Sequence, residues 1–309
     1  MADASLRKSV LHLFALFCLL PGLLIGSAQP SVAGPGIKIV GPDQAWPGSV
    51  RIDLEAMRPH GESFKTRDPN FVDDGLTGFT GIGLPGLLAL AGIEGQPGLT
   101  AVGSDQYVGY LSPDDLSRGF LVWEMNGRPV SGLKGGPLKL VFVENSGVHA
   151  SCYTWYVEAL IAVPLERAVL SVTFKTETVR YHRADMIPKS VPLDHSLFSI
   201  AQGCRNGFED TCTAGRVGAV PLSRLLPARN EGEPVASVEF IPFAGPGVTL
   251  GPEILDYPVF ILTGCGDRML HPALGGPFSV VFPVERYPEL MDMVPESGAL
   301  FFLEKIVVE

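Results

Sequence analysis

The sequence predicts a β-rich α+β fold in which one structural unit occurs twice. Short apolar segments alternate with polar residues at the two-residue period of a strand. The 36 glycines and 27 prolines among 309 residues divide these segments with turns, and they exclude long helices and coiled coils. Several short segments also recur, in the same order, in the second part of the chain. A chain of this length is long enough for two domains of ordinary size.

Four pairs of similar segments define the repeat. They are IEGQP at 93–97 with NEGEP at 230–234, LSPDDL at 111–116 with LGPEIL at 250–255, GGPLKLVFV at 135–143 with GGPFSVVFP at 275–283, and WYVEALIAV at 155–163 with FFLEKIVVE at 301–309. One coincidence could be chance, but four in the same order at nearly constant offsets are not. The sequence therefore predicts two tandem homologous units, residues 37–166 and 167–309.

Local patterns predict the elements within each unit. Alternating or continuous apolar runs predict strands at 50–57, 120–127, 137–143, 168–181, 258–264 and 278–284. Leucine-rich segments that follow a Gly or Pro turn predict short helices at 84–93 and 221–228. Strands therefore outnumber helices in the expected architecture.

Residues 1–33 have the three parts of an export signal. A basic pair, Arg7-Lys8, precedes an apolar run at 10–25, and small residues at 26–28 and 31–33 offer cleavage sites. The run is shorter than the roughly 20 residues that span a bilayer, so cleavage is favoured over an uncleaved anchor. We expect a periplasmic or extracellular protein that has no membrane span after leader cleavage.

Charge and cysteine content narrow the possible partners. Asp and Glu outnumber Lys and Arg by 33 to 23, and the formal charge is -10. No basic run follows the leader, so the chain has no electrostatic footprint for nucleic acid. Cleavage of the leader removes Cys18 and leaves Cys152, Cys204, Cys212 and Cys265 in an oxidising compartment, where we expect disulfides. Four cysteines allow three pairings, of which Cys204 with Cys212 closes the shortest loop.

The segment GIGLPG at 81–86 matches the glycine pattern of a dinucleotide-binding turn. That turn needs an apolar parallel strand in front of it, and residues 70–80 do not have the pattern of one. The aligned segment of the second unit, AVPLSRLL at 219–226, has none of these glycines. We therefore interpret the motif as accidental and the leucines after it as packing residues.

Four segments of the first unit form an ordered set of motifs. They are TGIGLPGLLALAG at 80–92, VGSDQYVGYLSPDDL at 102–116, FLVWEMNGRPVSGLKGGPLKLVF at 120–142 and TWYVEALIAV at 154–163. This set resembles the molybdopterin-binding domain of the sulfite oxidase family, with Gln106 in place of a usual Gly and Lys139 in place of a usual Arg. In the second unit VPLSRLL and GGPFSVVFP match, whereas FIPFAGPG replaces the S-D-G-Y segment. The resemblance implies two divergent tandem copies of this domain.

The resemblance also implies where a molybdenum ion would be bound. Enzymes of the family hold the metal through a cysteine shortly before the helix, because a thiolate is a soft anionic donor suited to a high-valent metal. The first unit has Thr66 and Arg67 there instead. The second unit has Cys204, Arg205 and Asn206, in the order C-R-N-G rather than C-R-G-N. These three are the candidate molybdopterin-binding residues, with Cys204 as metal ligand and catalytic residue, so only the second unit could be catalytic.

Two less specific clusters could also bind ligands. His149 and Cys152 are three positions apart and could share a soft metal such as copper, although one pair makes no site. Arg128, Lys134 and Lys139 surround the first GGP turn and could meet a small anionic ligand, with a solvated edge as the simpler interpretation.

Two functions are therefore in competition. The first is an exported molybdopterin-dependent oxidoreductase, or a degenerate descendant of one, served by a redox partner. The second is a cofactor-free binding or scaffold protein that keeps the fold, with Cys204 and Cys212 joined. An exported cysteine so close to another is more often half of a disulfide than a metal ligand, and the leader has no twin-arginine pair. These features favour the second function, whereas the family association favours the first.

Overall fold

The chain folds mainly into β-strands, with a few short helices, as the sequence predicts. The computed structural model describes residues 34–95, 97–165, 167–193, 217–226, 234–295 and 297–309. We refer to residues 34–165 as the first half and to residues 167–309 as the second half. Among the described residues, no helix is long and apolar enough to cross a membrane.

The first half contains two five-stranded sheets. The first has the order β3 (Val50–Asp53), β1 (Gly36–Val40), β11 (Val157–Val163), β6 (Gly98–Gly103) and β7 (Val108–Leu111). Only β1 and β11 pair parallel in it. The second has the order β10 (Lys139–Phe142), β8 (Gly119–Met125), β5 (Leu76–Gly83) and β4 (Glu62–Arg67), with β9 (Arg128–Pro129) beside β8. All its pairs are antiparallel.

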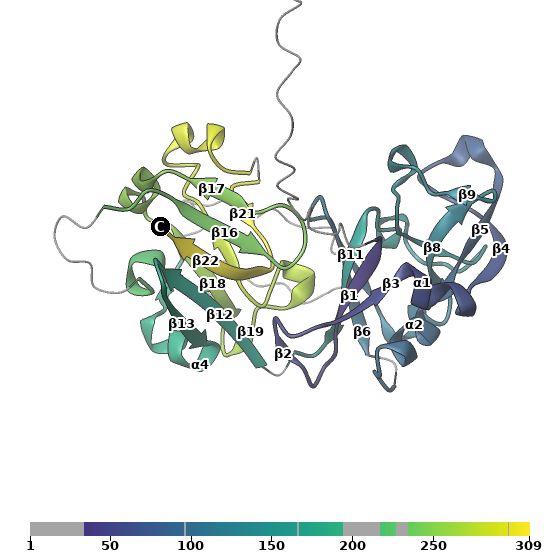
Figure 1. Ribbon diagram of the computed structural model, residues 1–309, viewed down its shortest axis with the longest axis horizontal. Coiled ribbons are helices and arrows are strands. Elements are labelled where there is room, and N and C mark those ends of the chain that lie inside the picture. The colour runs from purple at the N-terminus through teal and green to yellow at the C-terminus, as the bar shows by residue number, and fades with distance from the viewer. Residues whose placement is uncertain (1–33, 96, 166, 194–216, 227–233, 296) are drawn as a thin grey trace, which may run out of the picture. The chain divides into compact units, whose positions relative to one another are not determined.

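The second half also contains two sheets. One is six-stranded and has the order β13 (Glu177–His182), β12 (Arg167–Phe174), β22 (Leu303–Val308), β16 (Val238–Pro242) and β17 (Val248–Leu250), with β2 (Ala45–Trp46) of the first half parallel beside β12. Figure 1 shows β12, β22 and β16 side by side. The other has the order β14 (Val191–Pro192), β15 (Val217–Pro221), β18 (Phe260–Cys265), β20 (Ser279–Val281) and β21 (Ala299–Leu300), with β19 (Arg268–Met269) beside β18.

The strand order of the first half matches that of the second. The order β3-β1-β11-β6-β7 corresponds to β13-β12-β22-β16-β17, and β10-β8-β5-β4 corresponds to β20-β18-β15-β14. Each half has its parallel pair at the same place, β1 with β11 and β12 with β22. Two pairs of the repeated segments occupy matching places: each GGP turn leads into β10 or β20, and the last pair contains β11 or β22. The pair at 93–97 and 230–234 lies partly outside the described residues.

The helices are short. The α-helices are α1 (Leu54–Met57), α2 (Leu84–Leu90), α3 (Pro113–Leu116) and α4 (Arg183–Met186). The 3-10 turns are η1 (Arg58–His60), η2 (Val72–Asp74), η3 (Gly132–Lys134), η4 (Ala150–Cys152), η5 (Ile187–Lys189), η8 (Leu222–Arg224), η9 (Pro252–Asp256), η10 (Pro272–Leu274) and η11 (Pro288–Asp292).

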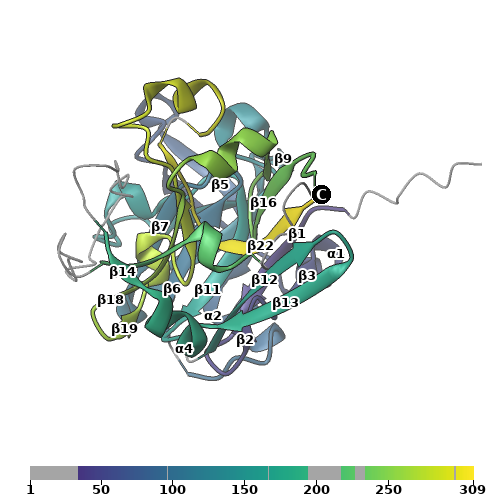
Figure 2. The ribbon, with the colours of Figure 1, turned by 90° about the vertical axis from the view of Figure 1, so that its left-hand side faces the viewer.

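Most predicted elements are found, and three differ. The expected strand at 50–57 ends at Asp53, because this residue is the N-cap of α1 and the following Leu-Glu-Ala-Met run favours a helix. The expected strand at 168–181 is a pair of antiparallel strands, β12 and β13, which lie next to each other in Figure 2. The predicted helix at 84–93 is α2, whereas the one at 221–228 is only the turn η8, and its residues 227 and 228 lie outside the described residues.

The strand before the GIGLPG motif also differs from the expectation. Residues 76–83 do form a strand, β5, but it pairs antiparallel with both β4 and β8. A dinucleotide-binding turn follows a parallel strand. The motif therefore has the wrong sheet context, as the sequence comparison of the two units also indicated.

Strand β11 is buried on both of its faces and connects two cores. Leu160 and Ala162 pack into a core made of first-half residues. Ala159 and Ile161, on the opposite face, pack into a core that includes Phe240 and many other second-half residues. Side chains alternate along a strand, so a continuous apolar run can serve both cores. The second of these cores therefore contains residues of both halves, whereas the first contains first-half residues.

Candidate functional site

The first half contains a pocket of about 430 Å³ that is formed by loops. The size is within the range of sites for small organic ligands. Its lining residues come from the end of β4, the β6–β7 connection, η4 and the approach to β11; they are Asn70, Asp105, Tyr107, His149, Ala150, Ser151, Tyr153 and Trp155. Three of the eight are aromatic, and one, Asp105, is a carboxylate.

A buried ion pair lies behind the pocket wall. Lys139 Nζ binds a carboxylate oxygen of Asp68, and both side chains are 1% exposed. The same Nζ donates to the backbone oxygen of Lys134 at 3.2 Å, and Asp68 accepts a hydrogen bond from the backbone N–H of the pocket residue Asn70 at 3.0 Å. Burial lowers the pKa of Lys139, and the bond with Asp68 opposes this change. The pair therefore fixes the loop that carries Asn70.

Two stacked aromatic rings complete this side of the pocket. The rings of Phe71 and Trp155 are 5.2 Å apart and nearly parallel. Lys139 Nζ lies 4.7 Å from the Phe71 ring centre and 5.0 Å from that of Trp155, and Lys134 Nζ lies 3.8 Å from that of Phe71. Ammonium groups are attracted to the faces of aromatic rings. The rings at the edge of the pocket therefore already contact two cationic side chains.

Trp155 can occupy its place only because residue 135 is a glycine. Gly135 has a φ of 88°, which side chains rarely adopt. A Cβ atom there would lie 2.6 Å from Trp155 Cγ. The glycine of the first GGP turn therefore determines the position of a pocket residue.

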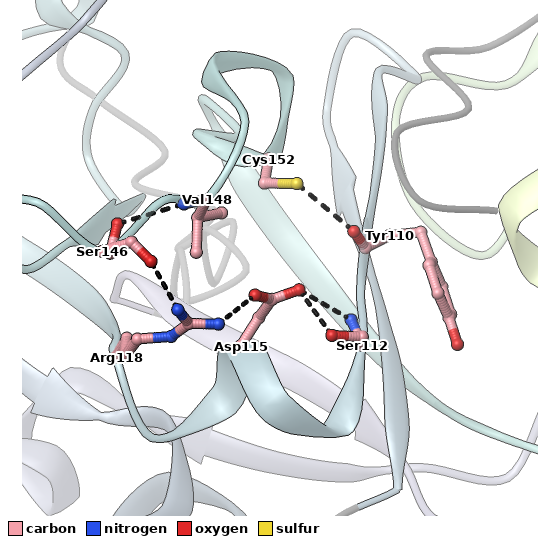
Figure 3. Close-up of polar contacts among 7 residues, drawn as sticks. All are labelled: Tyr110, Ser112, Asp115, Arg118, Ser146, Val148 and Cys152. Atoms are coloured by element: carbon pink, nitrogen blue, oxygen red, sulfur yellow. Dashed lines mark hydrogen bonds and ion pairs between the residues drawn. The ribbon is translucent and has the colours of Figure 1, made fainter.

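A polar network holds the opposite wall, and Figure 3 shows it. Asp115 in α3 accepts hydrogen bonds from the Ser112 hydroxyl at 2.6 Å and from Arg118 at 2.6 Å. Arg118 also donates to the backbone oxygen of Ser146, whose hydroxyl accepts from the backbone N–H of Val148 at 3.4 Å. The network therefore ties α3 to the segment that leads into η4, where the pocket residues Ala150 and Ser151 lie.

The polar groups of that wall are largely bonded to one another. His149 Nδ1 lies 2.8 Å from the Ser151 hydroxyl, and the Tyr107 hydroxyl donates to the backbone oxygen of Ser151 at 2.7 Å. Asp105 accepts from the backbone N–H of Tyr107 at 3.0 Å through one carboxylate oxygen. Burial raises the pKa of Tyr153, against the effect of its hydrogen bond with Ser146, so its phenol stays protonated.

The structure does not bring His149 and Cys152 together as a metal site. His149 bonds to Ser151, whereas the Cys152 thiol donates to the backbone oxygen of Tyr110 at 3.4 Å, as Figure 3 shows for the thiol. Across the described part of the chain, no group of three His, Cys, Asp or Glu side chains could hold a metal ion.

The basic cluster predicted around the first GGP turn is not a solvated edge. Lys139 is fully buried, because its charge is compensated by Asp68. Lys134 pairs with Asp74 at 2.6 Å, and only Arg128, on β9, is exposed as expected. No local pattern indicates the two pairs, because the partners of Lys134 and Lys139 lie 60 and 71 positions earlier in the chain.

The candidate molybdenum site cannot be placed. Cys204, Arg205 and Asn206, together with Cys212, lie outside the described residues. Of the other predicted cysteines, Cys152 keeps its thiol and Cys265, at the end of β18, is disulfide-bonded. The pairing of Cys204 with Cys212 stays a prediction.

The corresponding position of the first half is described, and its groups are engaged internally. Thr66 is completely buried, and its hydroxyl donates to the backbone oxygen of Phe142 at 2.9 Å. Arg67 is exposed and pairs with Glu144 at 3.4 Å. A buried threonine hydroxyl that is already bonded to the backbone is no substitute for a thiolate.

Gln106, which departs from the resemblance, joins the two halves. Its side chain donates to the backbone oxygen of Ala244 at 3.2 Å and accepts from the backbone N–H of Phe301 at 2.9 Å. The residue has a φ of 65°. Opposite it, Gly245 has a φ of 83°, and a Cβ there would lie 2.7 Å from the backbone oxygen of Ser104. At this point the seam has room for the side chain of Gln106 but not for a side chain on residue 245.

Comparisons with known proteins give little further information. No protein-family model matches the chain, and no curated protein matches it. Among solved structures, the sulfane dehydrogenase SoxCD from Paracoccus pantotrophus is similar with a TM-score of 0.34 and 11% sequence identity, over 88% of this chain and 74% of that chain. This similarity to a dehydrogenase is weak, and it indicates no function for the chain.

Proposed function

We propose that the protein is an exported, cofactor-free binding protein that holds a small organic ligand in the first-half pocket. The observation that carries the proposal is that the first half keeps a pocket while its metal-ligand position is filled by Thr66. Thr66 and the Asp68–Lys139 pair are bonded inside the protein, and three aromatic residues line the pocket. Export is part of the proposal and is inferred from residues 1–33.

We also propose that the two halves are divergent copies of one sulfite-oxidase-type domain. The matching strand orders support a duplication, because two unrelated halves would not share the place of the parallel pair in their sheets. The ordered motifs of the first half support the family of the domain. Fold and function are separate, so the duplication does not imply that either copy is an enzyme.

The described residues of the first half do not fit a molybdenum cofactor. The metal needs a soft anionic donor, and a hydroxyl that donates to a backbone oxygen is neither soft nor anionic. The cofactor carries phosphate, and the charged pocket-lining side chain is the carboxylate of Asp105, which would repel it. The first half therefore supports no reaction through this cofactor.

One sequence observation favours a second candidate function. Cys204, Arg205 and Asn206 precede VPLSRLL as the cysteine motif precedes the helix in molybdopterin-dependent oxidoreductases. In that case the second half would bind molybdopterin through Cys204 and depend on a redox partner. An oxidoreductase of this kind would contain molybdenum, whereas the proposed binding protein would not.

Metal content is the first test. Molybdenum is measured in protein purified from its own compartment, for the wild type, Cys204→Ser and the control Cys152→Ser. We expect far less than one molybdenum per chain in all three. Stoichiometric metal that is lost in Cys204→Ser and kept in Cys152→Ser would establish the oxidoreductase instead. Peptide mapping without reduction identifies the cysteine that pairs with Cys265.

Ligand binding in the pocket is the second test. A compound set of varied charge is screened by thermal denaturation, because a ligand that binds the folded state stabilises it. Ala150→Trp fills the pocket, whereas Ala56→Trp adds the same ring on exposed α1. We expect compounds that stabilise the wild type and Ala56→Trp but not Ala150→Trp. If no compound shows this pattern, the proposal is wrong.

A further inference from the structure

We infer that the first-half pocket binds an organic cation, an ammonium compound with apolar or aromatic substituents. The inference rests on the proposed function, since it names the class of ligand for the same pocket. Three features of the pocket lead to it: its charge, its aromatic lining and the internal bonding of its polar groups.

The charge of the pocket favours a cation. Asp105 is the acidic member of the lining, and no lysine or arginine is among the eight lining residues. Its side chain is exposed, and the bond from the Tyr107 N–H uses one of its two carboxylate oxygens. A carboxylate beside a low-dielectric wall attracts a cationic ligand more strongly than the same group in open water.

The nearby lysines do not reverse this charge. Lys139 is paired with Asp68, and Lys134 is paired with Asp74. With Asp105, the region therefore has three carboxylates against two ammonium groups. An anion could gain a lysine only if that lysine left its partner, and a buried charge separated from its partner is costly.

The aromatic lining also favours a cation. Trp155, Tyr107 and Tyr153 contribute rings, and rings attract ammonium groups by about 0.5–2 kcal/mol at distances up to roughly 6 Å. The protein already uses this interaction beside the pocket, where Lys134 and Lys139 lie over Phe71 and Trp155. A carboxylate together with several rings is the usual protein environment for alkylammonium groups.

The internal bonding of the polar groups argues against a sugar. A polyhydroxylated ligand needs several donors and acceptors from the wall. The Tyr107 hydroxyl donates to Ser151, and the Ser151 hydroxyl pairs with His149. The hydroxyls of Tyr107 and Ser151 are therefore already bonded within the wall, and a sugar could gain them only by displacing these bonds.

The test compares ligands that have the same shape and different charge. Choline and 3,3-dimethyl-1-butanol differ in one central atom, a quaternary nitrogen or a carbon. Benzyltrimethylammonium, benzoate and glucose extend the set to an aromatic cation, an aromatic anion and a sugar. Binding is measured by isothermal titration calorimetry at ligand concentrations up to the millimolar range, on the wild type and on the Ala150→Trp variant.

Two charge variants make the test specific. Asp105→Asn removes the carboxylate charge and keeps an oxygen for the Tyr107 N–H. Asp114→Asn removes the same charge from an exposed position on α3, outside the pocket. We expect the cations to bind about tenfold more tightly than the neutral isostere. We expect Asp105→Asn to lose about tenfold of that affinity and Asp114→Asn to lose less than about twofold.

The outcomes separate the ligand class from the proposed function. If benzoate, glucose or the neutral alcohol binds the wild type as tightly as choline and does not bind the Ala150→Trp variant, the ligand class is wrong and the binding function stands. If choline binds equally well to Asp105→Asn, the ligand class is also wrong. If no compound binds in a way that Ala150→Trp abolishes, both the ligand class and the proposed function fail.

Discussion

The two halves keep the same backbone arrangement and differ in the side chains around their GGP turns. Gly135 and Gly275 both have a φ of 88°, and each lies under an aromatic residue, Trp155 or Phe301. Four residues after each glycine, the first half has the buried Lys139 and the second half has the buried Ser279, whose hydroxyl donates to the backbone oxygen of Gly275 at 2.8 Å. The GGP turn therefore positions an aromatic ring in both halves. The buried polar residue four positions after its first glycine differs between them.

The largest expected effect comes from breaking the ion pair that only the first half has. Asp68→Ala leaves Lys139 buried and unpaired, so we expect the free energy of unfolding to fall by about 4 kcal/mol. Urea denaturation measures it. The double variant Asp68→Leu with Lys139→Met removes both charges and should lose far less. A loss as large in the double variant as in Asp68→Ala would show that packing, and not the charge pair, stabilises this region.

The two glycines allow a matched pair of variants. Gly135→Ala and Gly275→Ala each place a side chain at positive φ against an aromatic ring, so each should lower the free energy of unfolding by about 3 kcal/mol. Only Gly135→Ala displaces a pocket residue, Trp155, so it alone should weaken choline binding. Denaturation and calorimetry on both variants measure the two effects. Equal weakening in both variants would place the ligand site elsewhere.

The seam between the halves gives a smaller effect. Gln106→Ala removes two hydrogen bonds to the second half while it keeps a side chain at positive φ, so we expect a loss of about 2 kcal/mol. Gln106→Gly loses the same bonds but relieves the backbone, and should lose about 1 kcal/mol. Thermal denaturation of both variants measures the order. The reverse order would mean that the backbone of residue 106 is not strained.

The smallest effect concerns the pH dependence of stability. Burial raises the pKa of Glu304 on β22, against the effects of Lys38 from the first half and Lys305. The folded state therefore favours the protonated form of Glu304. The stability that this protonated carboxyl contributes is present at acidic pH and is lost as pH rises through the pKa of the folded state. In the Glu304→Gln variant the free energy of unfolding should decrease less as pH rises. Near neutral pH the variant should be more stable than the wild type by less than about 1 kcal/mol, because the side chain is only half-buried. Denaturation between about pH 4 and about pH 8 measures both profiles. A steeper profile for the variant than for the wild type would contradict this expectation.

The sequence predicted more of the fold than of the site. Continuous apolar runs located β8, β10, β18 and β20, because a strand that is buried on both of its faces has that pattern. The short helix α1 was missed because its four residues follow the apolar pattern of the preceding strand.

The site residues were hidden for a different reason. Asp68 and Lys139 pair across 71 positions, and no local pattern reveals such a contact. Trp155 precedes β11, and its position depends on the positive φ of Gly135, which no local pattern of the sequence reveals. Gln106 was recognised as a departure from the resemblance, but its contacts with Ala244 and Phe301 depend on how the halves pack.

The most direct test of the central claim is native mass spectrometry of the protein purified from its own compartment. We expect the mass of the polypeptide without molybdopterin, either alone or with a small organic cation that does not bind to the Ala150→Trp variant. A dominant species with the added mass of molybdopterin and molybdenum, absent from the Cys204→Ser variant, would contradict it.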